Sequence, residues 1–314
     1  MRYVGLQEQI RRNNRKSVFL LIAFPSVLLL SVYAVVFLLQ YQPDYGYDLD
    51  YINQNFLAVA PIVVVIVGIW FAIAYFSHTK MISMATGARP LERKNNMKIY
   101  NMVENLCISE GMRMPKVEII DSPALNAYAS GIDEKSYTVT LTRGIIEALD
   151  DDELEGVIAH ELMHIRNRDV RLLVISIIFV GIFTFLVQIS FRSFLYGGGR
   201  RNNKDSGKFM LVILVVSIVA YLLTMLFRFS LSRSREYMAD SGAATMTRKP
   251  WALASALRKI SGRHQIKDVK SEEIKQLFIE NTPDKKNANI FSSLGGLFST
   301  HPPIEKRIAF LDRV

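Results

Sequence analysis

The sequence predicts a mainly α-helical integral membrane protein, in which four hydrophobic helices accompany an α+β domain with a small antiparallel sheet. Hydrophobic residues make up 50% of the 314-residue chain, more than a water-soluble domain of this size normally contains. They gather in four long apolar runs. We therefore expect a membrane anchor with two transmembrane helices over 1–80, a first part of the α+β domain over 81–169, a hydrophobic hairpin over 170–229, and the rest of the domain over 230–314.

The first two apolar runs are long enough to cross a bilayer. The run 18–39 would form a helix of about 33 Å, and 56–76 is a second uncharged span. The first run is too long for a signal peptide and no small-residue cleavage site follows it, so we expect it to stay in the protein. Basic residues precede the first run and follow the second. This pattern places the N-terminus and the α+β domain in the cytoplasm of a multi-pass plasma-membrane protein.

From about residue 85 to 168 the composition is that of a soluble domain. An amphipathic helix over 99–111 ends at a glycine. Runs rich in β-branched and aromatic residues predict three strands, over 116–121, 126–129 and 136–141. Thr142 or one of its neighbours could cap a short helix that runs through Ala148.

The third and fourth apolar runs, over 172–189 and 209–227, predict a helical hairpin. The loop between them carries five basic residues against one acidic residue, which the positive-inside rule disfavours outside the cell. Either the charges around the first two runs fix the orientation and this loop crosses the membrane despite its basic residues, or the hairpin enters the membrane without fully crossing it. We favour crossing, because runs of 18 and 19 apolar residues are just long enough.

The segment His160-Glu161-Leu162-Met163-His164 predicts a metal site. Acidic residues at 150–153 predict the start of a helix that carries this segment, since carboxylates stabilise a helix N-terminus. Two histidines four positions apart share one helix face and can bind one metal ion, while the glutamate between them can act on a metal-bound water. The alternative is a helix with two chance histidines. The metzincin pattern is excluded, because Asn167 and Val170 stand where it requires glycine and histidine.

The two histidines need a third protein ligand, and Glu236 is the candidate. The hydrophobic hairpin begins within two turns of His164 and ends shortly before Glu236, and the two ends of an antiparallel hairpin meet on one side. Asp240 follows four residues later on the same helix face, where it can bind the second nitrogen of a ligand imidazole. The alternative is that Glu236 is a surface carboxylate paired with a nearby arginine.

Four motifs follow one another along most of the chain. They are Asn126-Ala-Tyr-Ala-x-Gly131, His160-Glu-x-x-His164, Ser234-Arg-Glu-Tyr-x-Ala-Asp240 and Thr300-His-Pro-Pro-Ile-Glu-Lys-Arg307. Together they resemble the HtpX membrane metalloproteases, which are related to the type I CAAX prenyl proteases. The resemblance implies a zincin-like metalloprotease domain that holds one Zn2+ per chain through His160, His164 and Glu236, with Glu161 as general base.

The same resemblance implies how a substrate is held. The strand with Asn126, Ala127 and Tyr128 would offer its edge to an extended polypeptide. His301 and Arg307 would approach the scissile bond from the far side of the cleft. Taken alone, His301 is a loop histidine and Arg307 is a surface charge, so both roles depend on the family pattern.

The C-terminal part of the chain is less regular. A helix is predicted over 251–260, which is rich in alanine and leucine. Residues 264–289 are lysine-rich and polar, and we expect a mobile cytoplasmic segment there. Residues 294–298 are a candidate lid or membrane-touching loop.

The resemblance implies a zinc endopeptidase that acts in protein quality control under stress, and the membrane placement leads us to expect membrane or misfolded proteins as its substrates, on the cytoplasmic side. A competing hypothesis is a specific maturation protease for a lipidated or peptide precursor, and another is a membrane sensor with a structural zinc. The net charge of +9 comes from basic residues beside the apolar runs, which favours contact with the lipid bilayer over nucleic acid. The single cysteine, Cys107, cannot form an internal disulfide and is expected to be buried.

Overall fold

The computed structural model describes residues 6–40, 46–197, 215, 219, 234–261, 277–279 and 302–314. The chain divides into two compact units. One unit draws on residues 1–15, 77–175 and 228–314, and the other on 16–76 and 176–227. The first unit holds the predicted metal motif and therefore positions the candidate site.

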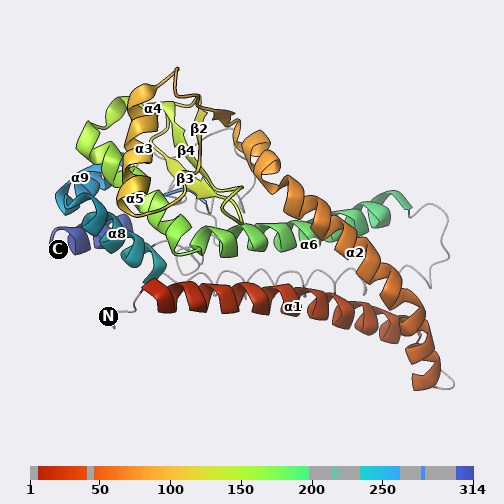
Figure 1. The fold of residues 1–314 in the computed structure, drawn as a ribbon. Helices are drawn as coiled ribbons and strands as arrows, with labels where there is room; N and C mark the ends of the chain where they lie inside the picture. The colour runs from red at the N-terminus through yellow and green to blue at the C-terminus, as the bar shows by residue number, and fades with distance from the viewer. Residues whose placement is uncertain are drawn as a thin grey trace. The chain divides into compact units, whose positions relative to one another are not determined.

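Two long helices, α1 (Leu6–Leu39) and α2 (Leu49–Thr86), carry the first two apolar runs (Figure 1). In the part of the chain that the structure describes, two helices are long and apolar enough to cross a membrane, over Gln7–Leu39 and Leu49–Thr86. Large apolar side chains of α2 are exposed, among them Phe76 at 84% and Ile62 at 60%. Such a surface is unfavourable in water and suits lipid.

The third apolar run lies on α6 (Asp169–Gly197). Phe179 of this helix stacks on Phe24 of α1 and on Phe71 of α2, with ring centroids 4.3 and 5.1 Å apart. The fourth run, 209–227, lies outside the described residues except for 215 and 219. Four membrane-spanning helices therefore remain a prediction.

A sheet with the strand order β1-β2-β4-β3 lies in the first unit. Its strands are β1 (Arg89–Pro90), β2 (Lys116–Ile120), β3 (Ala127–Ser130) and β4 (Thr138–Thr142). The two outer pairs are antiparallel, but β2 and β4 are parallel. The prediction of an antiparallel sheet is therefore wrong for the central pair. β4 enters between β2 and β3, and the residues of a strand do not encode which neighbour it will pair with.

Short polar side chains begin the helices around the sheet. Helix α3 (Met97–Ser109) is capped by Asn96, whose side chain accepts a hydrogen bond from the amide of Ile99. Helix α4 (Arg143–Ala148) is capped by Thr142, whose hydroxyl accepts a hydrogen bond from the amide of Ile145. The predicted cap at Thr142 is thus confirmed. Cys107 of α3 is buried, as expected.

Helix α5 (Asp151–Arg166) carries the metal motif and begins at a capping box. The Asp150 carboxylate accepts the amide of Glu153, and the Glu153 carboxylate accepts the amide of Asp150, both at 2.9 Å. These bonds satisfy two backbone donors that a helix start leaves open. The acidic start read from the sequence therefore fixes where the helix begins.

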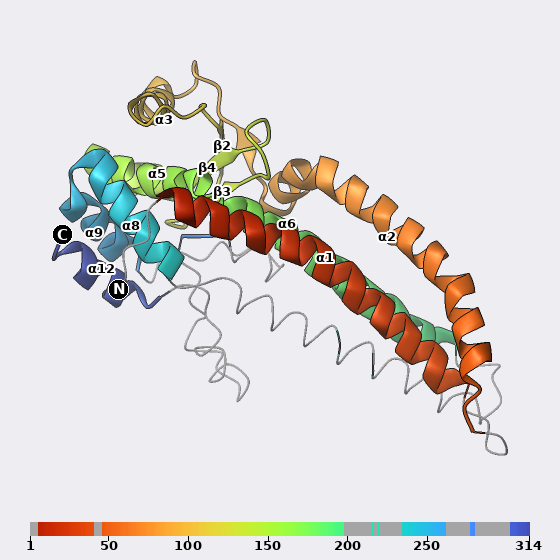
Figure 2. The ribbon, with the colours of Figure 1, turned by 60° about the horizontal axis from the view of Figure 1, so that its bottom comes forward.

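In the described residues of the C-terminal part, the unit has three helices: α8 (Ser234–Thr247), α9 (Pro250–Ile260) and α12 (Ile304–Leu311). Helix α5 packs against β3 on one side and against α8 and α9 on another, and α12 packs on α8 and α9 (Figure 2). Helix α9 confirms the helix predicted over 251–260. Gly156 permits the close approach of α9, since a Cβ there would lie 3.2 Å from the Leu253 backbone.

Candidate metal centre

Helix α5 places the two histidines of the motif one turn apart. Their Nε2 atoms are 3.1 Å apart, and the His160 side chain is fully buried. Two imidazole nitrogens this close face the same point from one helix. The i, i+4 spacing in the sequence therefore produces the arrangement that it predicts.

Helix α8 brings Glu236 to the same point. Its two carboxylate oxygens lie 3.7 Å from the Nε2 atoms of His160 and His164, one oxygen to each ring. The three potential ligand atoms all lie within 4.8 Å of one another. Two imidazoles and one carboxylate are a donor set that catalytic zinc uses, and a buried carboxylate between two imidazoles is stabilised by a cation. The residues present therefore fit a zinc ion.

A carboxylate binds the second ring nitrogen of each histidine. Asp240 lies 3.0 Å from the Nδ1 atom of His160, and Asp169 lies 3.2 Å from the Nδ1 atom of His164. Such contacts fix the orientation of a ligand imidazole. The structure brings Asp240 to the ring of His160, where the sequence led us to expect it, whereas no role was predicted for Asp169. The signal for Asp169 was its position at the start of the third apolar run, where the chain turns back beside His164.

Arg307 of α12 is also buried in this cluster, with 1% of its surface exposed. It donates two hydrogen bonds to Asp240, of 2.9 and 2.7 Å, and its Nη1 atom lies 3.6 Å from Glu236. From the sequence without the family pattern, Arg307 was expected to be a charged residue on the surface. The structure instead brings it to the metal centre, as the family pattern implies. His301 lies outside the described residues.

The burial of the cluster shifts its acid–base properties. Burial raises the pKa of Glu161, and the nearby Glu236 charge adds to this effect. Burial also tends to raise the pKa of Asp240, but the Arg307 guanidinium outweighs it and the pKa is lowered. For His164, burial tends to lower the pKa, but the Glu236 and Asp169 carboxylates outweigh this effect and raise the pKa to about 10. Two carboxylates of one site thus have pKa values shifted in opposite directions.

Strand β3 lies beside α5, but its side chains do not form the metal site. The Asn126 side chain accepts the amide of Ala127, and the Tyr128 hydroxyl is 2.9 Å from that of Thr86 in the interior. A small cavity of about 20 Å³ beside the metal centre is lined by Ala129 of β3 and by Glu161, His164 and Glu236. The Asn126 and Tyr128 side chains are thus engaged within the fold, and the role of this strand's edge in substrate binding stays a prediction.

The edge of β3 is paired with residues Leu277, Phe278 and Ile279. The amide of Ile279 donates to the carbonyl of Ala127 at 2.9 Å, and the Phe278 ring lies 5.5 Å from that of Tyr128. Arg307 donates to the Ile279 carbonyl at 3.1 Å, and Leu277 lines the cavity of the metal centre. All three side chains are buried. The expectation of a mobile polar segment is wrong for these residues. It was based on the composition of the whole lysine-rich stretch, in which three apolar residues have little weight.

Comparison with known proteins agrees with this geometry. The family model for peptidase family M48 matches residues 93–314. The Protease HtpX homolog of Bacteroides fragilis is 54% identical over all of both chains, and that of Dictyoglomus thermophilum is 38% identical over 96% of this chain and 92% of its own. The crystal structure of S. mikatae Ste24p aligns with 95% of this chain and 65% of its own, slightly under two thirds, with 20% identity and a TM-score of 0.48.

These matches confirm the resemblance drawn from the four motifs. The family model covers the segments that supply His160, His164, Glu236 and Arg307. The two apolar helices α1 and α2 agree with a membrane protein. The chain therefore belongs to peptidase family M48, and it is a membrane zinc metalloendopeptidase related to the HtpX proteases.

Proposed function

We propose that this chain cleaves membrane or misfolded proteins on the cytoplasmic side of the plasma membrane, in protein quality control. The observation that carries the proposal is the buried group of His160, His164 and Glu236, with the buried Glu161 carboxylate on the same helix as the histidines. Basic residues precede the first apolar run and follow the second, which supports the placement of the α+β domain in the cytoplasm. Proximity of the metal motif to an apolar run in the sequence favours substrates at the membrane surface.

The proposed mechanism assigns one task to each group. Zinc held by His160, His164 and Glu236 would supply a water of lowered pKa and polarise the scissile carbonyl. Glu161 takes a proton from the attacking water and passes it to the leaving amine.

The donor set favours a catalytic over a structural site. A structural zinc is closed by four protein ligands. Among the residues that the structure describes, the metal-binding group consists of three residues, and the neighbouring Asp240 carboxylate is engaged by Arg307. An open position is what a catalytic zinc requires. This arrangement argues against the membrane-sensor hypothesis.

We also propose that an extended substrate pairs with the edge of β3. Residues 277–279 support this, because their hydrogen bond to the Ala127 carbonyl is the kind that an added strand makes. The hydrogen bond from Arg307 to the Ile279 carbonyl supports this too, because here the guanidinium contacts a carbonyl of a segment that pairs with β3. Arg307 would then bind a substrate carbonyl, and residues 277–279 would compete with the substrate for the same place.

Substitution Ile279→Pro tests this competition. Proline has no amide hydrogen and cannot donate to the Ala127 carbonyl, so the internal segment should yield more easily to a peptide. We expect the KM for an extended peptide to fall roughly fivefold, the equivalent of one hydrogen bond of about 1 kcal/mol. The matched control is Ile279→Ala, which keeps the amide. A KM that is unchanged in the proline variant, or that falls equally in both, would contradict the assignment.

Metal removal tests the zinc requirement. Dialysis of the detergent-purified protein against a chelator is expected to abolish casein cleavage, and stoichiometric zinc is expected to restore it. Metal analysis of the same samples should give one zinc per chain. Full activity in a sample shown to be free of metal would refute the proposed mechanism.

A substrate screen separates quality control from maturation of one precursor. Hydrogen bonds to a strand backbone read no side chains, so pairing with β3 predicts cleavage of many unfolded membrane proteins. Cleavage confined to the C-terminal region of one lipidated precursor, with unfolded membrane proteins untouched, would favour the maturation hypothesis.

A further inference from the structure

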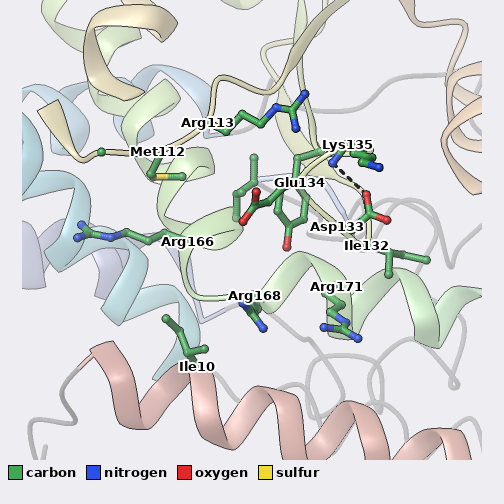
Figure 3. Close-up of a pocket in the computed structure, with 13 residues that line it drawn as sticks. Ile10, Met112, Arg113, Ile132, Asp133, Glu134, Lys135, Arg166, Arg168 and Arg171 are labelled. Atoms are coloured by element: carbon green, nitrogen blue, oxygen red, sulfur yellow. Dashed lines mark hydrogen bonds between the residues drawn. The ribbon is translucent and has the colours of Figure 1, made fainter. Parts of the chain in front are cut away.

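A second, larger cavity lies in the same unit as the metal centre. Its volume is about 760 Å³, and it shares no lining residue with the small cavity at the metal centre. Its wall comes from the start of α1, the loop after α3, the turn between β3 and β4, and the junction of α5 with α6 (Figure 3). Four separate segments of the chain therefore meet around it.

The lining of this cavity is strongly basic. Five cationic side chains line it, against the carboxylates of Asp133 and Glu134; the five are Arg113, Lys135, Arg166, Arg168 and Arg171. Asp133 is used by the turn itself, where it accepts the amides of Lys135 and Ser136 at 3.0 Å. The cavity thus has a net positive charge and is suited to an anion.

Four of these five cations have no carboxylate partner among the described residues. Arg166 is paired with Glu110. Among the residues that the structure describes, no carboxylate lies within ion-pair distance of Arg113, Lys135, Arg168 or Arg171. The buried Nε atom of Arg171 has no hydrogen-bond partner there either. A buried donor left without an acceptor is unfavourable, and a bound anion would satisfy it.

Arg168 is held in a backbone conformation that an arginine rarely adopts. It has a φ of 59° at the corner between α5 and α6, where glycine or asparagine is usual. Its side chain nevertheless lines the cavity, as Figure 3 shows. Its Nη1 atom donates to the Asn14 side chain at 3.2 Å, and because a guanidinium has five N–H donors, it can bind an anion as well.

The position of the cavity along the chain indicates a source for the anion. Arg171 directly precedes the apolar run 172–189, and Ile10 lies on α1, which carries the apolar run 18–39. Basic residues beside membrane-spanning segments bind anionic lipid headgroups. Arginines also bind phosphate oxygens with two parallel hydrogen bonds.

We propose that this cavity binds a phosphate ester, and that a phospholipid supplies it. Arg168 and Arg171 form its main contacts, with Arg113 and Lys135 adding positive charge. The acyl chains would lie outside the cavity. This site is separate from the metal centre and does not depend on the proposed substrate or mechanism.

Native mass spectrometry of the full-length, zinc-loaded protein in detergent tests the site. The probes are phosphatidylglycerol, the zwitterionic phosphatidylcholine, and soluble glycerol 3-phosphate. We expect one phosphatidylglycerol per chain in the wild type and about 30-fold weaker binding in Arg168→Gln/Arg171→Gln, because each basic residue contributes roughly a factor of five. Phosphatidylcholine should bind equally weakly to both. The matched control, Arg143→Gln/Arg258→Gln, removes two exposed arginines away from the cavity.

Each result is decisive. Equal binding of phosphatidylglycerol to the wild type and the Arg168/Arg171 variant overturns the proposal, as does an equal loss in the control variant, which would show diffuse attraction to positive charge. Glycerol 3-phosphate that binds as tightly as the lipid supports the site but makes a soluble phosphate its source.

A second variant separates binding from folding. Arg168→Gly relieves the backbone strain, so its thermal midpoint is expected to rise by about 2–4 °C while lipid binding weakens. A more stable protein that binds less lipid can only have lost a functional side chain. A less stable variant with unchanged lipid binding would show that Arg168 serves the fold alone.

Discussion

Substitution Glu161→Gln is expected to abolish peptide-bond hydrolysis while zinc stays bound. The amide has the shape of the carboxylate but cannot take a proton from water, so the general-base contribution is lost. Such a contribution is worth up to about 10⁴-fold, and we expect the rate of casein cleavage to fall by about 10³-fold or more. The zinc content should not change, because the proposed ligands are His160, His164 and Glu236.

The control for this experiment lies on the same helix. Glu155→Gln of α5 removes a partly exposed carboxylate that pairs with Lys249, and it should leave cleavage nearly unchanged. Hydrolysis by the Glu161→Gln protein at the wild-type rate, with equal zinc, would show that another group is the base. If neither wild type nor variant cleaves casein although each holds one zinc, a maturation protease of narrow specificity becomes the better hypothesis.

Substitution Arg307→Ala is expected to destabilise the metal centre more than any other single change. It leaves the Asp240 carboxylate buried without its bidentate partner and removes a positive charge 3.6 Å from Glu236. Breaking a buried ion pair in this way costs about 3–5 kcal/mol. We expect a large drop in the thermal midpoint and in zinc occupancy, measured on the same samples.

The double variant Arg307→Ala/Asp240→Asn distinguishes charge from packing. It removes both charges, so part of the lost stability should return, whereas a purely packing role for Arg307 predicts no recovery. Arg258→Ala is the matched control, because it breaks the exposed ion pair with Asp312, which is worth at most about 1 kcal/mol. A thermal midpoint for Arg307→Ala as high as that of this control would contradict the buried-pair interpretation.

The sequence predicted what depends on short spacing. Helix α5, its capping box and the shared face of His160 and His164 all follow from residues within one or two turns of one another. These features depend on local geometry, which a single sequence encodes. Glu236 is distant in the chain, and it was placed near the histidines only by assuming that the two apolar runs between them form a hairpin.

Features that depend on distant pairing were not predicted. The place of β4 between β2 and β3, the partnership of Asp169 with His164, and the pairing of 277–279 with β3 each depend on which segments meet after folding. Arg307 is the clearest case. Without the family pattern, the charge of Arg307 predicts a side chain exposed to solvent. Its burial is explained by the ion pair with Asp240, which lies 67 positions away in the chain.

The metal centre is assembled from helices that the ribosome makes at very different times. The histidines of α5 come first, Glu236 and Asp240 of α8 follow, and Arg307 of α12 is added 147 positions after His160. Until then Asp240 has no buried counter-charge. A chain interrupted before Arg307 therefore lacks the buried counter-charge of Asp240, so the cluster around the histidines reaches its final charge balance only when the last helix is in place.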